Sequence, residues 1–85
     1  MKKEFRRNVK IGNHSFQVTD AAPEVYRITL VYDDGSEGTF YKGFYDEDAA
    51  ERYCVVKKHE TNNVVDCYYN YSFTVIFDGG DEDEE

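Results

Sequence analysis

Apolar and polar residues alternate along much of this chain, which is the period of a half-buried β-strand. The alternation is most regular over residues 65–77, so this segment predicts a strand with one core face and one wet face. The predicted core face comprises Val65, Cys67, Tyr69, Tyr71, Phe73, Val75 and Phe77. Thirteen extended residues would span roughly 43 Å, which is long for a small domain. We therefore expect a bend, a bulge or a break near residues 69–70.

The N-terminal third of the chain predicts a hairpin followed by a third strand. Apolar residues lie on both sides of Gly12 and Asn13 within residues 5–19, and this pair suits a tight hairpin turn. Pro23 then interrupts the pattern, because proline donates no hydrogen bond to a neighbouring strand. Residues 25–32 resume a regular alternation and predict the third strand.

Residues 37–45 predict a fourth strand, after a turn at residues 33–36. Aromatic residues fall on both faces of this segment. Gly38 and Gly43 interrupt it, and a glycine within a strand indicates a bulge or the close approach of another backbone.

A helical period replaces the alternation between residues 46 and 60. The predicted packing stripe holds Ala49, Tyr53 and Val56, with Ala50 and Cys54 beside it. Three acids open the segment and three basic residues close it, an arrangement that complements the helix dipole. Residues 61–63 form the turn that ends the helix.

The predicted order is therefore strand, strand, strand, strand, helix, strand. We expect an α+β domain over residues 1–80, in which one helix packs on one face of an antiparallel sheet of about five strands. Residues 81–85 are all acidic and predict a disordered tail. Because one helix covers only one face, the second, Tyr-rich face becomes either a contact surface or a homodimer interface.

Charge is distributed unevenly along the chain. The first ten residues carry +4, so residues 11–85 carry −12 of the net −8. This balance opposes binding to nucleic acid and anionic membranes and favours a basic protein surface as the partner. The first residues lack the apolar stretch of a secretion signal, and no run approaches the roughly 20 apolar residues of a membrane span. We expect a cytoplasmic protein.

Residues suited to catalysis or metal binding are few. His14, His59, Cys54 and Cys67 are the only soft ligands, and the two cysteines lack the compact spacing of a zinc site. No nucleophile, base and orienting acid form a recognisable pattern. We expect no enzymatic activity, no metal and no cofactor. Buried, reduced cysteines are the favoured interpretation, with a disulfide between helix and last strand as the alternative.

The junction at residues 44–53, in a short acidic α+β chain with many surface carboxylates, resembles the small phage-encoded inhibitors of host defence, including anti-CRISPR proteins. The resemblance implies a stoichiometric inhibitor in the host cytoplasm, which occupies the basic channel of a nucleic-acid-binding effector with carboxylates. It transfers no functional residue, because those inhibitors share no common motif.

The charge layout and the abundance of tyrosine predict a partner-binding surface of folded acids with tyrosine anchors. The predicted partner-binding residues are Asp33, Asp34, Glu37, Tyr41, Tyr45, Asp46, Glu47, Asp48, Glu51 and Asp78. The alternative function is that of a structural or adaptor subunit that homodimerises through the uncovered sheet face.

Overall fold

The computed structural model describes residues 5–77 and confirms both the α+β class and the predicted order of elements. The elements are β1 (Arg6–Ile11), β2 (His14–Thr19), β3 (Glu24–Tyr32), β4 (Glu37–Phe44), α1 (Glu47–Glu60) and β5 (Val64–Thr74). The turn between β1 and β2 falls at the predicted glycine, since Gly12 adopts a φ of 58°.

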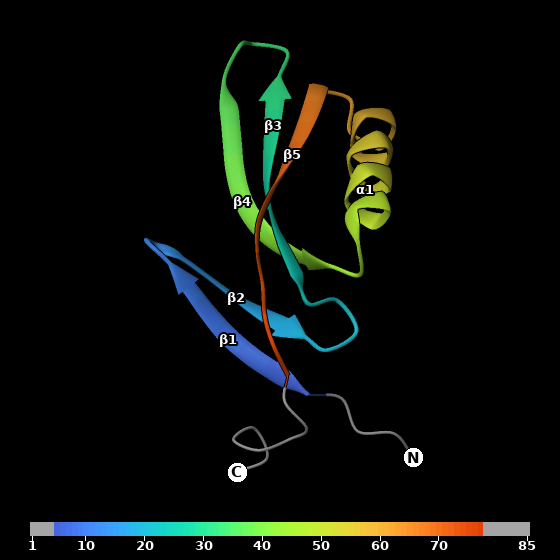
Figure 1. The fold of residues 1–85 in the computed structure, drawn as a ribbon. Coiled ribbons are helices and arrows are strands. Elements are labelled where there is room, and N and C mark those ends of the chain that lie inside the picture. The colour runs from blue at the N-terminus through green and yellow to red at the C-terminus, as the bar shows by residue number, and fades with distance from the viewer. Residues whose placement is uncertain (1–4, 78–85) are drawn as a thin grey trace.

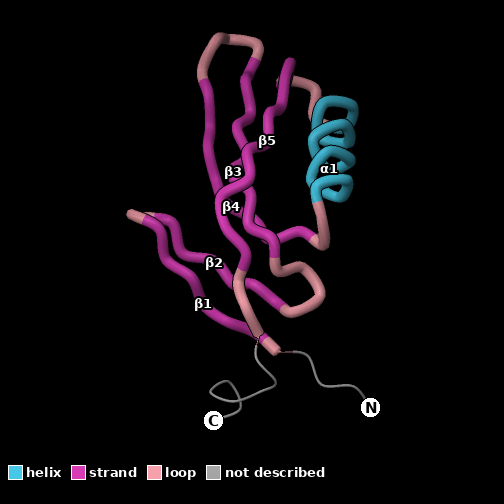
Figure 2. Tube along the Cα trace, in the orientation of Figure 1, coloured by secondary structure: helices cyan, strands magenta, loops and turns pink. Residues whose placement is uncertain are grey.

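The strands form two sheets, so the prediction of one sheet of about five strands is wrong. β1 and β2 make a two-stranded antiparallel hairpin, and the second sheet has the order β4-β3-β5, also antiparallel (Figures 1 and 2). The connection between the sheets turns tightly, because Ala22 N donates to Thr19 O at 3.0 Å. The hairpin consequently packs across the second sheet through side chains instead of pairing at its edge.

One face of the three-stranded sheet packs against α1. This core contains Tyr26, Ile28, Phe44, Ala50, Cys54 and Cys67, all buried. Ile28 lies at its centre, with Phe40 opposite on β4 and Tyr69 opposite on β5. The helix thus covers the face on which β3 places its even-numbered residues.

The other face of the same sheet packs against the β1–β2 hairpin. Val18, Val25 and Val75 form the buried centre of this second core. Val9, Phe16, Tyr41, Phe73 and Phe77 are partly buried around it. The hairpin therefore covers part of the face that we expected to remain uncovered, and the adjacent residues Val25 and Tyr26 are both buried because they point into different cores.

The helix begins and ends close to the predicted residues. Asp46 is the N-cap, where its Oδ1 accepts from Ala49 N at 3.0 Å, and Thr61 N donates to Lys57 O at 3.1 Å. The predicted packing stripe is wrong at Val56, which is 45 % exposed. The buried line runs instead through Ala50 and Cys54, so Val56 falls on its flank.

β5 contains two register irregularities that the strict alternation of its sequence conceals. Val25 pairs with Phe73 but Tyr26 pairs with Tyr71, so Ser72 is the extra residue of a bulge. The predicted bend, bulge or break near residues 69–70 is thus a bulge, and it occurs slightly later. Because one extra residue exchanges the two faces of a strand, odd-numbered residues face α1 before Ser72 and the hairpin after it.

The predicted core face of β5 is therefore wrong at two positions. The second irregularity leaves Val65 without a partner on β3, and its side chain is 57 % exposed while Val64 is buried. Tyr71 is 58 % exposed, because it lies beyond the part of the sheet that α1 covers.

Candidate functional site

The structure places the predicted partner-binding acids in two separate groups. Asp33 and Asp34 lie in the turn between β3 and β4, and Glu37 is the first residue of β4. Asp34 Oδ1 accepts from Ser36 N at 2.9 Å and from Ser36 Oγ at 2.6 Å, and these bonds lower the pKa of the Asp34 carboxyl group. The acids of this group are exposed.

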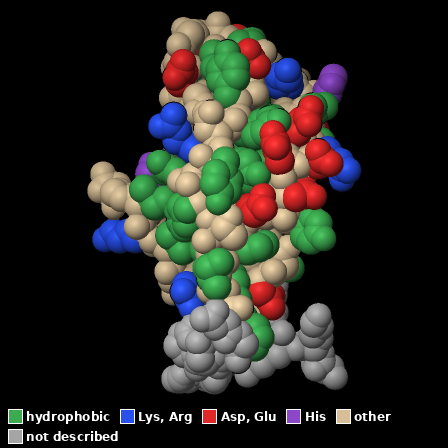
Figure 3. Space-filling view, in the orientation of Figure 1, with side chains coloured by type: hydrophobic (Ala, Val, Ile, Leu, Met, Phe, Trp, Pro, Cys, Tyr) green, Lys and Arg blue, Asp and Glu red, His purple; other side chains and the backbone are tan. Residues whose placement is uncertain are grey.

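The second group comprises Asp46, Glu47, Asp48 and Glu51, around the first turn of α1. Residues 38–45, most of them in β4, separate the two groups, which corresponds to roughly 26 Å of extended chain. Figure 3 shows that many of the carboxylates visible from this side gather on the half of the molecule that holds α1. The predicted residues therefore do not form one continuous patch.

The two predicted tyrosine anchors lie in different environments. Tyr45 is 72 % exposed beside the second group of acids. Tyr41 lies on the opposite face of the sheet, where its ring stacks on Phe16 at 6.0 Å and meets His14 edge-on at 5.3 Å. Tyr41 is thus largely engaged with the hairpin. Asp78 lies outside the described residues.

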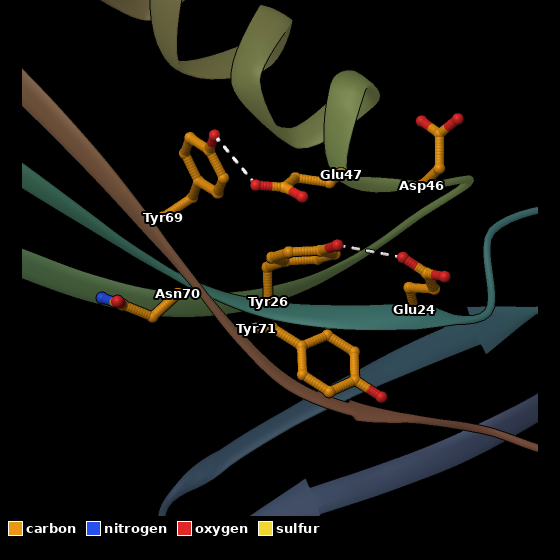
Figure 4. A pocket seen from close by; sticks show the side chains of 7 residues that line it. All are labelled: Glu24, Tyr26, Asp46, Glu47, Tyr69, Asn70 and Tyr71. Carbon is orange, nitrogen blue, oxygen red and sulfur yellow. Dashed lines mark hydrogen bonds between the residues drawn. The ribbon is translucent and has the colours of Figure 1, made fainter.

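A pocket of about 500 Å³ opens beside the second group of acids. Glu24 and Tyr26 reach it from β3, Asp46 and Glu47 from the start of α1, and β5 supplies Tyr69, Asn70 and Tyr71 (Figure 4). Of the sequence-predicted residues, only Asp46 and Glu47 line it. We call this feature the Tyr–acid pocket.

The three tyrosine rings of the Tyr–acid pocket pack edge to face. The buried ring of Tyr26 lies 6.1 Å from the Tyr69 ring and 5.5 Å from the Tyr71 ring, with interplanar angles of 61° and 75°. Behind them, Phe44 contacts Tyr26 in the same manner at 5.8 Å. These T-shaped contacts fix the orientation of ring faces that carry partial negative charge.

The carboxylates of the pocket are held by single hydrogen bonds. Tyr26 Oη donates to Glu24 Oε1 at 2.9 Å, and Tyr69 Oη approaches Glu47 Oε2 at 3.5 Å (Figure 4). Asp46 uses Oδ1 to cap the helix. Within residues 5–77, the other oxygen of each carboxylate accepts no hydrogen bond, so three acceptor atoms remain available to a ligand.

The pKa values of two tyrosines in this region are raised first by burial and then by nearby carboxylates. Burial raises the pKa of Tyr26, and its bond to Glu24 and the charges of nearby carboxylates raise it further. Burial also raises the pKa of Tyr69, with contributions from Glu51 and Glu47. The chemistry that the pocket offers is therefore the binding of a cation by carboxylate oxygens and aromatic faces.

Sequence reasoning missed four lining residues that matter here: Glu24, Tyr26, Tyr69 and Tyr71. It placed the three tyrosines in predicted strands without bringing them together across β3 and β5. One signal in the sequence was usable: Glu24 precedes Tyr26 by two residues, so the two side chains share a strand face. Their proximity to the start of α1, however, follows only from the three-dimensional fold.

Cys54 and Cys67 meet in the core between α1 and β5. They are free thiols whose sulfur atoms lie 2.8 Å apart, with Cys67 donating to Cys54. Burial raises the pKa of the Cys54 thiol to about 12, with a further contribution from Cys67. The structure thus supports the favoured interpretation of buried, reduced cysteines. Among the described residues, no group of three or more His, Cys, Asp or Glu residues is arranged to hold a metal ion.

Comparisons with protein-family models, with curated proteins and with solved structures found no match to this chain. Within residues 5–77, no helix has both the length and the apolar character needed to cross a membrane.

Proposed function

We propose that this protein binds a basic surface of a partner protein and inhibits that partner stoichiometrically, in the manner of a nucleic-acid mimic. One observation carries the proposal: Glu24, Asp46, Glu47 and Glu51 lie together around Tyr26 and Tyr69, so that carboxylates from two elements share one site. A basic partner is the counterpart that such a site attracts.

The fold supports this function because it holds the carboxylates in place before binding. Glu24 is on the central strand β3, and Asp46 is fixed by its bond to Ala49 N. Fixed charges lose less conformational freedom on binding than charges on a flexible segment. Exposed Tyr45 and Tyr71 lie next to these acids and supply the large amphipathic side chains that are enriched at interfaces.

The charge balance favours a protein partner over nucleic acid. Residues 5–77 contain eleven acids against eight lysines and arginines, and residues 78–85 add six acids. Association with a polyanion would bring like charges together, whereas association with a basic surface brings opposite charges together and accelerates encounter at low salt. The six acids of residues 78–85 add long-range attraction to the same partner.

A capture experiment with a competition step tests the proposal. The full chain is immobilised, a lysate of the source cell or host is applied at about 50 mM salt, and bound protein is eluted first with short duplex DNA or RNA and then with about 500 mM salt. We expect a nucleic-acid-binding protein that elutes with the competitor, and whose own nucleic-acid binding is lost at one equivalent of this chain. Recovery of no salt-sensitive basic protein refutes the proposal, as does a partner that still binds its nucleic acid.

Truncation after Gly80 separates the folded acids from the terminal ones. The truncation removes five carboxylates and leaves every residue of the Tyr–acid pocket. We expect a modest loss of affinity that high salt abolishes, because charges outside the Tyr–acid pocket contribute mainly screened, long-range attraction. If binding disappears while circular dichroism reports an intact fold, the folded acids do not form the binding site.

Homodimerisation remains a second candidate, favoured by the part of the sheet that the hairpin does not bury. Tyr68 lies there, 51 % exposed on the face of β5 that points away from α1. Sedimentation velocity at about 10 and 500 µM distinguishes the two functions. A sedimentation coefficient that rises with concentration, and that Tyr68→Ala suppresses, supports the dimer, whereas a constant monomer value excludes it.

A further inference from the structure

The Tyr–acid pocket combines two features that the proposed function does not by itself require. It has a defined volume of about 500 Å³, within the roughly 300–1,000 Å³ of sites that enclose small ligands. It also joins three ring systems to three carboxylates, and the seven residues that line it include no lysine or arginine. A flat acidic surface would need neither property to attract a basic partner.

We propose that this pocket receives a single arginine side chain of the partner, which serves as the anchor of the complex. The inference rests on the proposed function and adds to it the residue type that the site recognises. The guanidinium group lies against the tyrosine rings, and its N–H groups donate to the unoccupied oxygens of Glu24, Asp46 and Glu47.

The spread of the carboxylates favours an extended cation over a compact one. A metal ion needs its ligands to converge on one point, and no three acids in the described part of the chain do so. An ammonium group is also a compact charge, with three donors around one nitrogen. A guanidinium group carries five N–H donors spread over a plane, so it can satisfy acceptors that lie apart.

The rings favour arginine for a second reason. Guanidinium is planar and less strongly hydrated than ammonium, so it stacks on aromatic faces with a smaller loss of solvation. Tyr71 is exposed on one side of the pocket, and it packs against the buried Tyr26 ring, which holds it in place. A cation over the exposed Tyr71 ring gains the interaction that aromatic sites offer to positive groups.

Blocked tripeptides that differ only in the central side chain test the inference on the full chain. Acetyl-Gly-Arg-Gly-amide, the lysine analogue and the citrulline analogue are titrated at matched ionic strength, and the ring resonances of Tyr26, Tyr69 and Tyr71 are followed by NMR. Citrulline keeps the planar shape of arginine without its charge. We expect saturable shifts with arginine, a dissociation constant of about 1–10 mM, at least about threefold weaker binding of lysine, and none of citrulline.

Paired substitutions assign the binding to the pocket. Tyr71→Ala is matched by Tyr68→Ala, since the two side chains belong to the same strand and are similarly exposed, at 58 % and 51 %, yet only Tyr71 lines the pocket. Glu47→Gln is matched by Glu60→Gln at the other end of the same helix. We expect the pocket variants to weaken arginine binding by about fivefold or more, and the matched variants by less than about twofold.

The possible outcomes separate this inference from the proposed function. Saturable, arginine-preferring binding that the pocket variants abolish supports the inference even before a partner is found. Absence of any shift with arginine, equal affinity for lysine, or equal loss in both members of a pair overturns it. Capture of a basic partner that Tyr71→Ala leaves unchanged refutes the anchor while the broader acidic site stands.

Discussion

Gly43 is the residue whose substitution tests most directly how the hairpin sits on the sheet. It lies on β4, and a methyl group added there would be 2.5 Å from the carbonyl oxygen of Ala22 and 3.6 Å from Cγ1 of Val18. Such a carbon–oxygen separation does not occur in relaxed structures, so the two backbones must part by roughly 0.7 Å or more. Neither is free to move: Gly43 pairs with Val25, and Ala22 N donates to Thr19 O.

The size of the effect follows from this overlap. Forcing extra volume into a packed site typically costs about 1–3 kcal/mol, so Gly43→Ala should lower the free energy of unfolding by that amount. For a domain of this length each kcal/mol shifts the melting temperature by about 4–8 °C. Gly38→Ala is the matched control, because the added methyl group would meet only the tip of the Tyr32 side chain, at 3.4 Å. It should be neutral or stabilise by a few tenths of a kcal/mol.

Urea unfolding followed by circular dichroism measures both variants against the parent chain. We expect a lower midpoint for Gly43→Ala with a similar slope, and an unchanged or higher midpoint for Gly38→Ala. If the two variants have the same stability, the turn at Ala22 does not approach β4, and the packing of the hairpin on the sheet described above is incorrect.

Three further predictions concern the helix start and the buried ionisable groups. Asp46→Ala should cost about 0.5–2 kcal/mol in urea unfolding because Ala49 N loses its acceptor, whereas Asp46→Asn should retain most of the stability; equal losses would exclude the capping role. The thiols of Cys54 and Cys67 should resist alkylation at about pH 8 in the folded chain and react promptly in urea, so rapid labelling without denaturant would contradict their burial. In the folded state the pKa of Cys54 is raised to about 12 from 9.0, and that of Tyr26 is raised as well. Both protonated groups therefore stabilise the fold below their ordinary pKa values, and this contribution is lost as the pH rises through the pKa values of the folded state. The urea midpoint should therefore fall between about pH 8 and pH 10.5, and a constant midpoint would rule out this coupling.

The sequence predicted local structure well because local patterns encode it. The acids before Ala49 located the start of the helix, where Asp46 proves to be the N-cap, and Gly12 located the first turn. The division into two sheets could not be predicted, since alternation reports which residues share a face and not which strands pair. The bulge at Ser72 leaves no break in the alternation of the sequence. The strand changes there from one core to the other, and both cores require apolar residues at its odd-numbered positions.

The candidate site was predicted in part for a related reason. Asp46 and Glu47 stood out as neighbours in an acidic run, whereas Tyr26 and Tyr69 are separated by more than forty residues in the sequence. Their rings meet because β3 and β5 are adjacent and α1 begins beside both. Neither tyrosine differs from an ordinary core aromatic until strand order is known.

The passage of β5 from one core to the other also governs when the chain can fold as it is synthesised. Cys67 completes the helix-side core, and Val75 completes the hairpin-side core. A chain is synthesised from its N-terminus, so both cores wait for the same late strand. Neither half can therefore finish folding until β5 has emerged from the ribosome, and the two halves should acquire protease resistance together.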